Sequence, residues 1–206
     1  MNKKEELQIL KDKMEADDSL PLRKGDTNLV FGVGDPEAKI LFIGEGPGYW
    51  ENLKMEPFVG NAGKFLDQLL KSIGMPRESV YITNVVHHRP PENRDPLPEE
   101  MLAYGKYLDK IINVINPEVV VTLGRFSMGK FLPTAKISTT HGKLFRVNWN
   151  GKDLFVIPMY HPAASLRNGE VMRQEKEDFL RLPDALKKIS EKKKKKVPET
   201  EQMSLV

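Results

Sequence analysis

The sequence of 206 residues contains no cysteine. This absence excludes disulfides, a thiolate nucleophile and any metal or iron–sulfur cluster held by cysteine. Long apolar runs are missing as well. None approaches the roughly 20 residues that span a bilayer, so no membrane partner is expected. The N-terminal stretch MNKKEELQILKDKMEADD is too charged for a secretory leader and predicts a surface helix. We therefore expect a cytoplasmic, intracellular protein.

A strong excess of one charge is also lacking, because the net charge is only +3. The lysines gather near the C-terminus, with a run at Lys192–Lys196. An apolar content of 39% is enough for one domain with a core. We predict one domain over residues 1–189 and a lysine-rich disordered tail over 190–206. Such a tail either holds DNA weakly, in a salt-dependent way, or only keeps the protein soluble.

Strands and helices alternate along the chain. Apolar or β-branched runs predict strands at 38–46, 79–86 and 117–124, and Asn150-Gly151 predicts a hairpin whose second arm is a further strand. Apolar residues at helical spacing predict helices at 62–74, 96–116, 125–132 and 169–189, the last broken at Pro183. This alternation favours an α/β fold: a three-layer α/β/α sandwich with a central, mostly parallel four-stranded sheet.

Three motifs follow predicted strands, where ligands bind in such sheets. They are GEGPG, TNVVHHRPP and YHPAASLRN. Gly44, Gly46 and Gly48 let a ligand approach the backbone closely. However, the loop lacks the Lys-Ser/Thr ending of a nucleotide-binding P-loop, and its spacing does not match the dinucleotide fingerprint. Taken alone, it also fits an ordinary tight turn.

Taken together, GEGPGYWEN…PFVGNAGKFLDQLL, VYITNVVHHRPPENRDP, PEVVVTLG and YHPAASLRN resemble the uracil-DNA glycosylase superfamily in order and spacing. The resemblance runs from about Leu20 to Asp178 and is closest to family 4, the thermostable iron–sulfur type. It implies a hydrolase that flips uracil out of DNA and cleaves the N-glycosidic bond to start base-excision repair. It also implies uracil-containing DNA as the partner, a monomer and a place at the nucleoid.

The resemblance assigns roles to three side chains. Phe58 stacks on the uracil ring, Asn84 reads N3–H and O4, and His161 donates to O2 as charge develops on the leaving base. Core filling, strand-end capping and a structural histidine are the ordinary alternatives. The expected pocket wall is completed by Gly44, Gly46, Pro47 and Gly48.

Two carboxylates, Glu45 and Glu51, lie close to these motifs in the sequence. Many relatives carry an aspartate that orients water, but its position is Gly46 here, as small as in family 4. We count both glutamates as catalytic candidates, with Glu51 also a candidate for excluding the thymine methyl group. A salt-bridge or turn-capping role remains open for each.

The motif after His161 is expected to contact DNA. The resemblance makes Leu166 a wedge that fills the space left by the flipped base and Arg167 a phosphate contact. An ordinary helix-entry leucine is the alternative. The complete DNA-binding set that we predict is Arg89, Arg94, His141, Lys143, Ala164, Ser165, Leu166 and Arg167.

Family 4 implies a [4Fe–4S] cluster with four cysteine ligands. The corresponding positions here are Asp17, Leu20, His88 and Tyr104, so we expect neither a cluster nor another metal or cofactor. Packing by Leu20 and Tyr104, with polar contacts from His88, is expected to take its place. The basic insertion in which some relatives trap DNA covalently is also missing after the TNVV strand, which favours hydrolytic turnover.

The last residues, EQMSLV, resemble the short peptides that dock on bacterial sliding clamps, with Gln202, Leu205 and Val206 as anchors. Two alternatives to the uracil-DNA glycosylase remain. One is a catalytically silent uracil- or DNA-binding module, which the loss of the cluster cysteines leaves open. The other is a glycosylase with a wider range of deaminated bases, including hypoxanthine and xanthine.

Overall fold

The computed structural model describes residues 1–195. One sheet holds six strands in the order β1-β3-β2-β4-β6-β5. The strands are β1 (Val33–Gly34), β2 (Ile40–Gly44), β3 (Tyr81–Asn84), β4 (Val119–Leu123), β5 (Phe145–Trp149) and β6 (Lys152–Met159). The inner four, β3-β2-β4-β6, are parallel, and the two edge strands are antiparallel to their neighbours.

The α/β/α sandwich is therefore confirmed, but the predicted count of four strands is too low. The four parallel strands are those that the sequence indicates. β1 is only two residues long and carries no alternating pattern. β5 is the first arm of the predicted hairpin, and it pairs with β6 as an edge strand through the turn at Asn150-Gly151, where both residues have positive φ.

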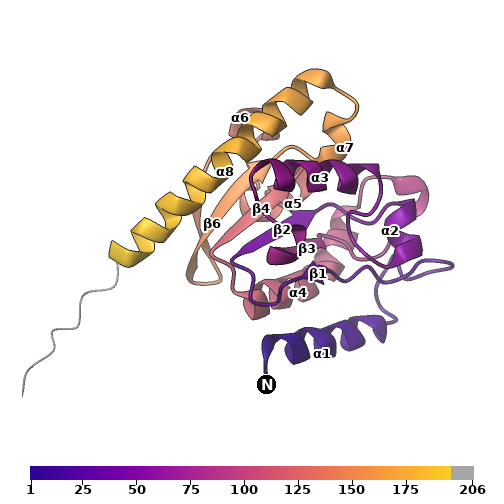
Figure 1. The fold of residues 1–206 in the computed structure, drawn as a ribbon. Coiled ribbons are helices and arrows are strands. Elements are labelled where there is room, and N and C mark those ends of the chain that lie inside the picture. The colour runs from indigo at the N-terminus through magenta and orange to yellow at the C-terminus, as the bar shows by residue number, and fades with distance from the viewer. Residues whose placement is uncertain (196–206) are drawn as a thin grey trace, which may run out of the picture.

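Helices cover both faces of the sheet (Figure 1). Their bounds are α1 (Lys3–Glu15), α2 (Tyr49–Lys54), α3 (Asn61–Ser72), α4 (Pro98–Ile115), α5 (Arg125–Phe131), α6 (Ile137–Thr140), α7 (Pro162–Ser165) and α8 (Gly169–Lys195), with short 3₁₀ turns η1 (Arg77–Ser79) and η2 (Pro91–Asn93). α1, α4 and α5 share one apolar core with the sheet, and α3 and α8 share the other. Neighbouring residues of one strand, such as Leu41 and Phe42, point into opposite cores because successive side chains of a strand alternate between the two faces of the sheet.

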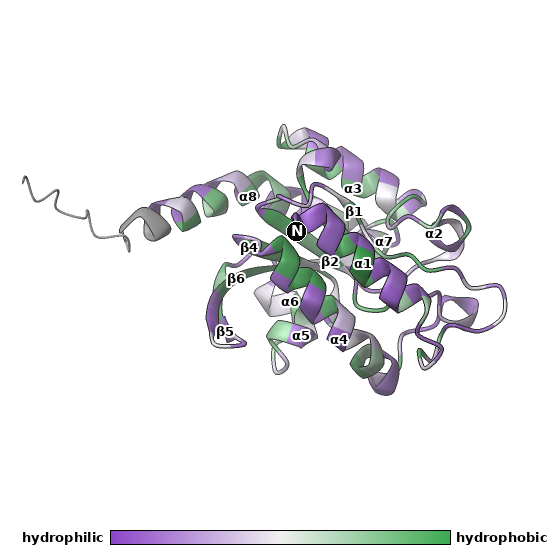
Figure 2. Ribbon diagram, turned by 90° about the horizontal axis from the view of Figure 1, so that it is seen from below, coloured by the Kyte–Doolittle hydropathy of each residue, from purple (hydrophilic) through white to green (hydrophobic). Residues whose placement is uncertain are grey.

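The predicted surface helix at the N-terminus is α1, and it docks through Leu7, Leu10 and Met14. It packs beside α4, as the view from below shows (Figure 2). Asn2 caps it, because its side chain accepts from Glu5 N while the Glu5 carboxylate accepts from Asn2 N. No helix in residues 1–195 is long and apolar enough to cross a membrane.

The predicted break at Pro183 is wrong, because α8 runs through this residue without interruption to Lys195. Proline removes one helical hydrogen bond, but Phe179, Leu182 and Ile189 are buried on both sides of it. This apolar stripe keeps the helix on the sheet past Pro183. The helix also covers residues 190–195, which the sequence assigns to the tail.

The carboxyl ends of the parallel strands lie at one edge of the sheet. β2 ends at Gly44, β3 at Asn84, β4 at Leu123 and β6 at Met159. The three motifs that the sequence singles out follow β2, β3 and β6. They therefore converge at this edge, as expected for a ligand site in a parallel sheet.

Candidate functional site

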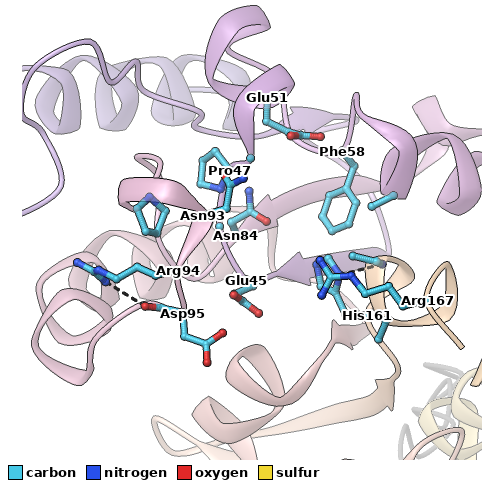
Figure 3. Close-up of a pocket in the computed structure, with 16 residues that line it drawn as sticks. Glu45, Pro47, Glu51, Phe58, Asn84, Asn93, Arg94, Asp95, His161 and Arg167 are labelled. Carbon is cyan, nitrogen blue, oxygen red and sulfur yellow. Dashed lines mark hydrogen bonds between the residues drawn. The ribbon is translucent and has the colours of Figure 1, made fainter.

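A pocket of about 340 Å³ opens at the carboxyl edge of the sheet. This volume is near the lower end of the range for small-molecule sites, so the pocket suits a compact ligand. Figure 3 shows side chains from the GEGPG loop, from β3 and the loop after it, and from the segment after β6 pointing into the same space. The lining residues are Glu45, Gly46, Pro47, Gly48, Glu51, Phe58, Ala62, Asn84, Pro90, Asn93, Arg94, Asp95, His161, Ala163, Ala164 and Arg167.

The glycines of the first loop make room for pocket side chains. A Cβ at Gly44 would lie 2.4 Å from Asn84 Oδ1 and 2.6 Å from the Phe58 ring. A Cβ at Gly46 would lie 2.7 Å from Val86 Cγ2. Both positions therefore exclude a larger side chain without a shift of their neighbours, and Gly46 in particular cannot carry a catalytic aspartate in this backbone.

Phe58 is buried in the pocket wall, with its ring 5.6 Å from the His161 ring between centroids. Its φ of 55° is left-handed, which is uncommon for a bulky residue and marks local strain. Gly63 in α3 makes this conformation possible, since a Cβ there would lie 1.8 Å from the Phe58 carbonyl oxygen. The start of α3 thus holds an aromatic ring against the pocket.

Asn84 ends β3 beside Gly44, its partner in the parallel ladder. Its side chain is 1% exposed, and its Oδ1 has no hydrogen-bond partner among the described residues. Buried polar side-chain atoms usually have a partner, so an orphaned oxygen in a pocket indicates a place for a ligand donor. Figure 3 shows the amide facing the space between Glu45 and Phe58.

His161 caps the short helix α7, and its Nδ1 accepts from Ala163 N at 3.1 Å. We assign the neutral tautomer from this hydrogen bond, with the proton on Nε2. Burial in the pocket wall lowers the His161 pKa to about 4. The ring is therefore neutral near pH 7 and offers an Nε2–H donor to the pocket.

Glu45 follows β2 and faces the same pocket (Figure 3). Burial and the nearby Asp95 raise its pKa to about 7, while Arg125 and Arg167 act in the opposite direction. No hydrogen bond to its carboxylate is found within residues 1–195. Glu45 can therefore gain or lose a proton near neutral pH, as a general base must.

Glu51, in α2, has a different geometry. Its Oε1 accepts from Val59 N at 3.0 Å and from Gly60 N at 2.8 Å, at the start of α3. Gly60 has no side chain with which to cap this helix, so the Glu51 carboxylate does so. Among the roles that the sequence leaves open for Glu51, these hydrogen bonds are of the capping kind, and they also fix the loop that carries Phe58. A catalytic role and exclusion of the thymine methyl group stay predictions.

On one side of the pocket lie two arginines of the predicted DNA-binding set. Arg94 makes a two-pronged ion pair with the buried Glu100, at 2.6 and 2.8 Å. Arg89 Nε donates to Asn93 Oδ1 at 2.7 Å, and its guanidinium lies 5.4 Å from the centre of the Tyr49 ring. Arg94 thus braces the loop after β3, while Arg89 does not line the pocket but contacts Asn93, which does. A DNA contact by either arginine stays a prediction.

The opposite side of the pocket is formed by the segment after His161. Ala164 and Arg167 line it, and Leu166 is 45% exposed just past α7, which fits a wedge. Ser165 instead points inward, is 1% exposed and donates to the buried Glu175 of α8. Its hydroxyl therefore holds α7 on α8, and a DNA contact by this side chain stays a prediction that its burial does not favour.

His141 and Lys143 do not line the pocket. His141 Nδ1 lies 2.6 Å from Asp178 Oδ2, and its ring lies 4.5 Å from that of Tyr160. Lys143 Nζ donates to Thr139 O at 2.8 Å. Both residues connect α6 and the following loop to their surroundings, and a DNA contact by either of them stays a prediction.

Comparison with known proteins leads to the same superfamily that the sequence motifs resemble. A sequence model of the uracil DNA glycosylase superfamily matches residues 31–184. The chain belongs to the uracil-DNA glycosylase superfamily. It is 47% identical over 182 residues to the type-4 uracil-DNA glycosylase of Archaeoglobus fulgidus, covering 86% of this chain and 88% of the relative. It is 40% identical over 188 residues to the type-4 uracil-DNA glycosylase of Thermotoga maritima, covering 90% and 97%.

A third relative is of the same type. The type-4 uracil-DNA glycosylase of Sulfurisphaera tokodaii is 44% identical over 164 residues, covering 76% of this chain and 74% of the relative. The matched region contains every pocket-lining residue, from Glu45 to Arg167.

In this member of the superfamily, the four positions of the expected cluster ligands do not fit an iron–sulfur cluster. Leu20 is apolar and buried, and Tyr104 is fully buried with its OH 2.8 Å from His88 Nδ1. Asp17 accepts from Tyr107 OH and Lys106 Nζ, each at 2.7 Å. None offers a thiolate, and no group of three potential metal ligands occurs in residues 1–195. Packing and hydrogen bonds hold the segments that carry these four positions.

Sequence reasoning missed part of the site. Asn93 and Asp95 line the pocket, although neither is among the site residues predicted from the sequence. The signal that could have identified them is their position, since both are polar residues between prolines in the segment after the TNVV strand. Glu175 was also missed, because a buried carboxyl on a charged helix looks like one of its surface neighbours in the sequence. Gln202, Leu205 and Val206 lie outside the described residues.

Proposed function

We propose that the protein is a uracil-DNA glycosylase that binds uracil flipped out of DNA in this pocket and hydrolyses its N-glycosidic bond without an iron–sulfur cluster. The observation that carries the proposal is the orphaned Asn84 Oδ1 beside the Phe58 ring. Uracil N3–H supplies the missing donor, and its O4 can accept from the Asn84 amide. Cytosine reverses this pattern, which leaves both groups unsatisfied. The names of the three relatives support the same substrate.

His161 stabilises the leaving base. As the C1′–N1 bond breaks, its electrons pass to uracil, and negative charge grows on O2. The neutral His161 donates Nε2–H toward that oxygen, and the hydrogen bond strengthens as the charge develops. The pKa of about 4 supports this role, since the ring stays neutral and in one tautomer throughout the neutral range.

Glu45 acts on the sugar side. Its ionised carboxylate opposes the positive charge that develops at C1′, and it accepts a proton from the water that adds to C1′. The pKa of about 7 places the ionised form in reach near neutral pH. Glu51 keeps a supporting role, because it fixes the loop of Phe58 through two backbone hydrogen bonds.

On the DNA side, Leu166 and Arg167 occupy the rim next to the pocket. Leu166 fills the space left in the duplex, and Arg167 contacts a phosphate. The C-terminal peptide with Gln202, Leu205 and Val206 stays a prediction of clamp binding. Removal of residues 197–206 tests it, because the shortened protein should lose binding to a bacterial clamp and keep glycosylase activity.

The test of the proposed function uses protein treated with a chelator and a labelled duplex with a single U·G pair. Alkali then cleaves any abasic site. We expect strand cleavage by the wild type, and a loss of roughly 100- to 1000-fold in kcat for His161→Ala, the size seen when one transition-state donor is removed. Binding of uracil-DNA without base release would support the silent module instead.

A further inference from the structure

Helix α2 presents an unusual surface. It buries none of its residues, and four large apolar side chains on it and at its C-terminal cap are more than half exposed. These residues are Tyr49 (53%), Trp50 (53%), Leu53 (56%) and Met55 (61%), and we call them the α2 apolar face. They make up four of the ten exposed large hydrophobic residues in the described chain. A cluster of this kind marks an interaction site.

The exposure does not come from a loosely held segment. Two polar side chains of α2, Glu51 and Asn52, fix the helix through hydrogen bonds to neighbouring segments. Asn52 Oδ1 accepts from Asn28 N at 2.7 Å, and Asn52 Nδ2 donates to Asp26 O at 3.1 Å. Glu51 accepts from two backbone amides at the start of α3. An ordinary surface helix buries its apolar side, whereas α2 leaves its apolar side chains exposed and uses polar ones to hold its neighbours.

The α2 apolar face adjoins the pocket. Gly48 and Glu51, at the start of α2, line the pocket, and Figure 3 shows Glu51 reaching down from this helix. The Tyr49 and Trp50 rings lie 5.2 Å apart at 83°. Arg89 places its guanidinium over Tyr49 and bonds to Asn93 of the pocket wall. Aromatic rings and a cation thus extend from the pocket rim.

Aromatic side chains beside arginine are what proteins use to bind unpaired nucleic acid. Bases stack on the rings, and the cation attracts the phosphates. Paired bases of a duplex are already stacked on one another and cannot use such rings. Resting on the proposed function, we propose that Tyr49 and Trp50 form a stacking platform for an unpaired base next to the flipped uracil. The preferred substrate is then uracil in single-stranded DNA.

Two assays on the full chain test this proposal. The first measures binding of a single-stranded oligonucleotide without uracil by fluorescence anisotropy. The second measures kcat and KM for uracil release from the same strand carrying one uracil, alone and in a duplex. Trp50→Ala and Tyr49→Ala remove the rings, and Trp50→Phe keeps one. Leu180→Ala, similarly exposed but on α8, is the matched control.

We expect Trp50→Ala to raise the dissociation constant and the single-strand KM roughly 5- to 100-fold, the change that corresponds to the loss of one base–aromatic stack. The duplex KM and kcat should change much less, Trp50→Phe should restore most of the binding, and Leu180→Ala should behave as wild type. α2 buries nothing, so these variants should fold, which circular dichroism checks.

Unchanged single-strand binding in both ring variants would overturn the platform, whether or not uracil is released. Equal losses on single strand and duplex would also overturn it, because they would indicate a general DNA contact. Self-association of the wild type that Trp50→Ala abolishes, with unchanged DNA binding, would assign the α2 apolar face to a second copy of the chain. Absence of uracil release with intact, Trp50-dependent binding would refute the proposed function alone and support the platform.

Discussion

The buried carboxyl of Glu175 should make the stability of the protein depend on pH. It is fully buried on α8, where its Oε2 accepts from Ser165 of α7 and its Oε1 has no partner among the described residues. Burial raises its pKa from 4.5 to about 8, a change that the Ser165 hydrogen bond only reduces. The folded protein therefore keeps this carboxyl protonated at pH 7, whereas the unfolded chain ionises it.

The sign of the effect on stability follows directly. Below pH 4.5 the Glu175 carboxyl is protonated in both the folded and the unfolded protein, so its contribution to the free energy of unfolding is fully present. As the pH rises toward 8, only the unfolded state ionises, so the free energy of unfolding falls by about 1.4 kcal/mol for each pH unit. Between pH 5 and pH 8 this loss is on the order of 4 kcal/mol. Glutamine mimics the protonated carboxyl, so Glu175→Gln should remove the loss.

The assay is urea unfolding of wild type and Glu175→Gln at several pH values between 5 and 8. Other groups also change the pH dependence, because folding lowers the pKa of His87, His88 and His161 and raises that of Glu45. The difference in the free energy of unfolding between wild type and Glu175→Gln isolates the contribution of Glu175. We expect Glu175→Gln to gain stability over wild type steadily as the pH rises. Glu177→Gln, on the exposed side of the same helix, is the control and should track wild type. A constant difference between wild type and Glu175→Gln would refute the reasoning.

Three further predictions concern the pocket and its support. Gly63→Ala should destabilise the fold and strongly reduce activity, because its Cβ would overlap the Phe58 carbonyl; thermal unfolding and a uracil-release assay check this. Tyr104→Phe should cost about 1–3 kcal/mol in urea unfolding, since it leaves the buried His88 ring without its partner. The rate of uracil release by the wild type should rise as the pH passes about 7, where Glu45 ionises, and Glu45→Gln should lose this rise in a pH–rate profile.

The sequence allowed the central architecture to be predicted because the inner strands are fully buried. A parallel strand such as β4, with every residue buried, appears as an unbroken apolar run. The edge strands lack this signal, since β1 has two half-buried residues and β5 alternates between half-buried and exposed ones. The helix prediction failed at Pro183 because it relied on the local tendency of proline to end a helix. The packing of Phe179 and Leu182 against the sheet outweighs that tendency here.

The site was predictable to the extent that its residues sit in motifs. Asn84 and His161 end or follow strands, and the sheet brings them together as expected. The left-handed backbone of Phe58 could not be predicted from the sequence, and neither could its dependence on Gly63. The Phe58 carbonyl meets Gly63 only because of the way in which the loop turns into α3. The raised pKa values of Glu45 and Glu175 need it as well. Burial causes both shifts, and a carboxyl's burial is not visible in a highly charged sequence.

The most direct test of the central claim is single-turnover uracil release from a U·G duplex by chelator-treated protein, beside Asn84→Ala and His161→Ala. We predict abasic sites with wild type, a large loss in both variants with their folds intact, and no dependence on added iron. Wild-type protein that binds the duplex without releasing uracil, or variants as active as wild type, would contradict a cluster-free glycosylase built on this pocket.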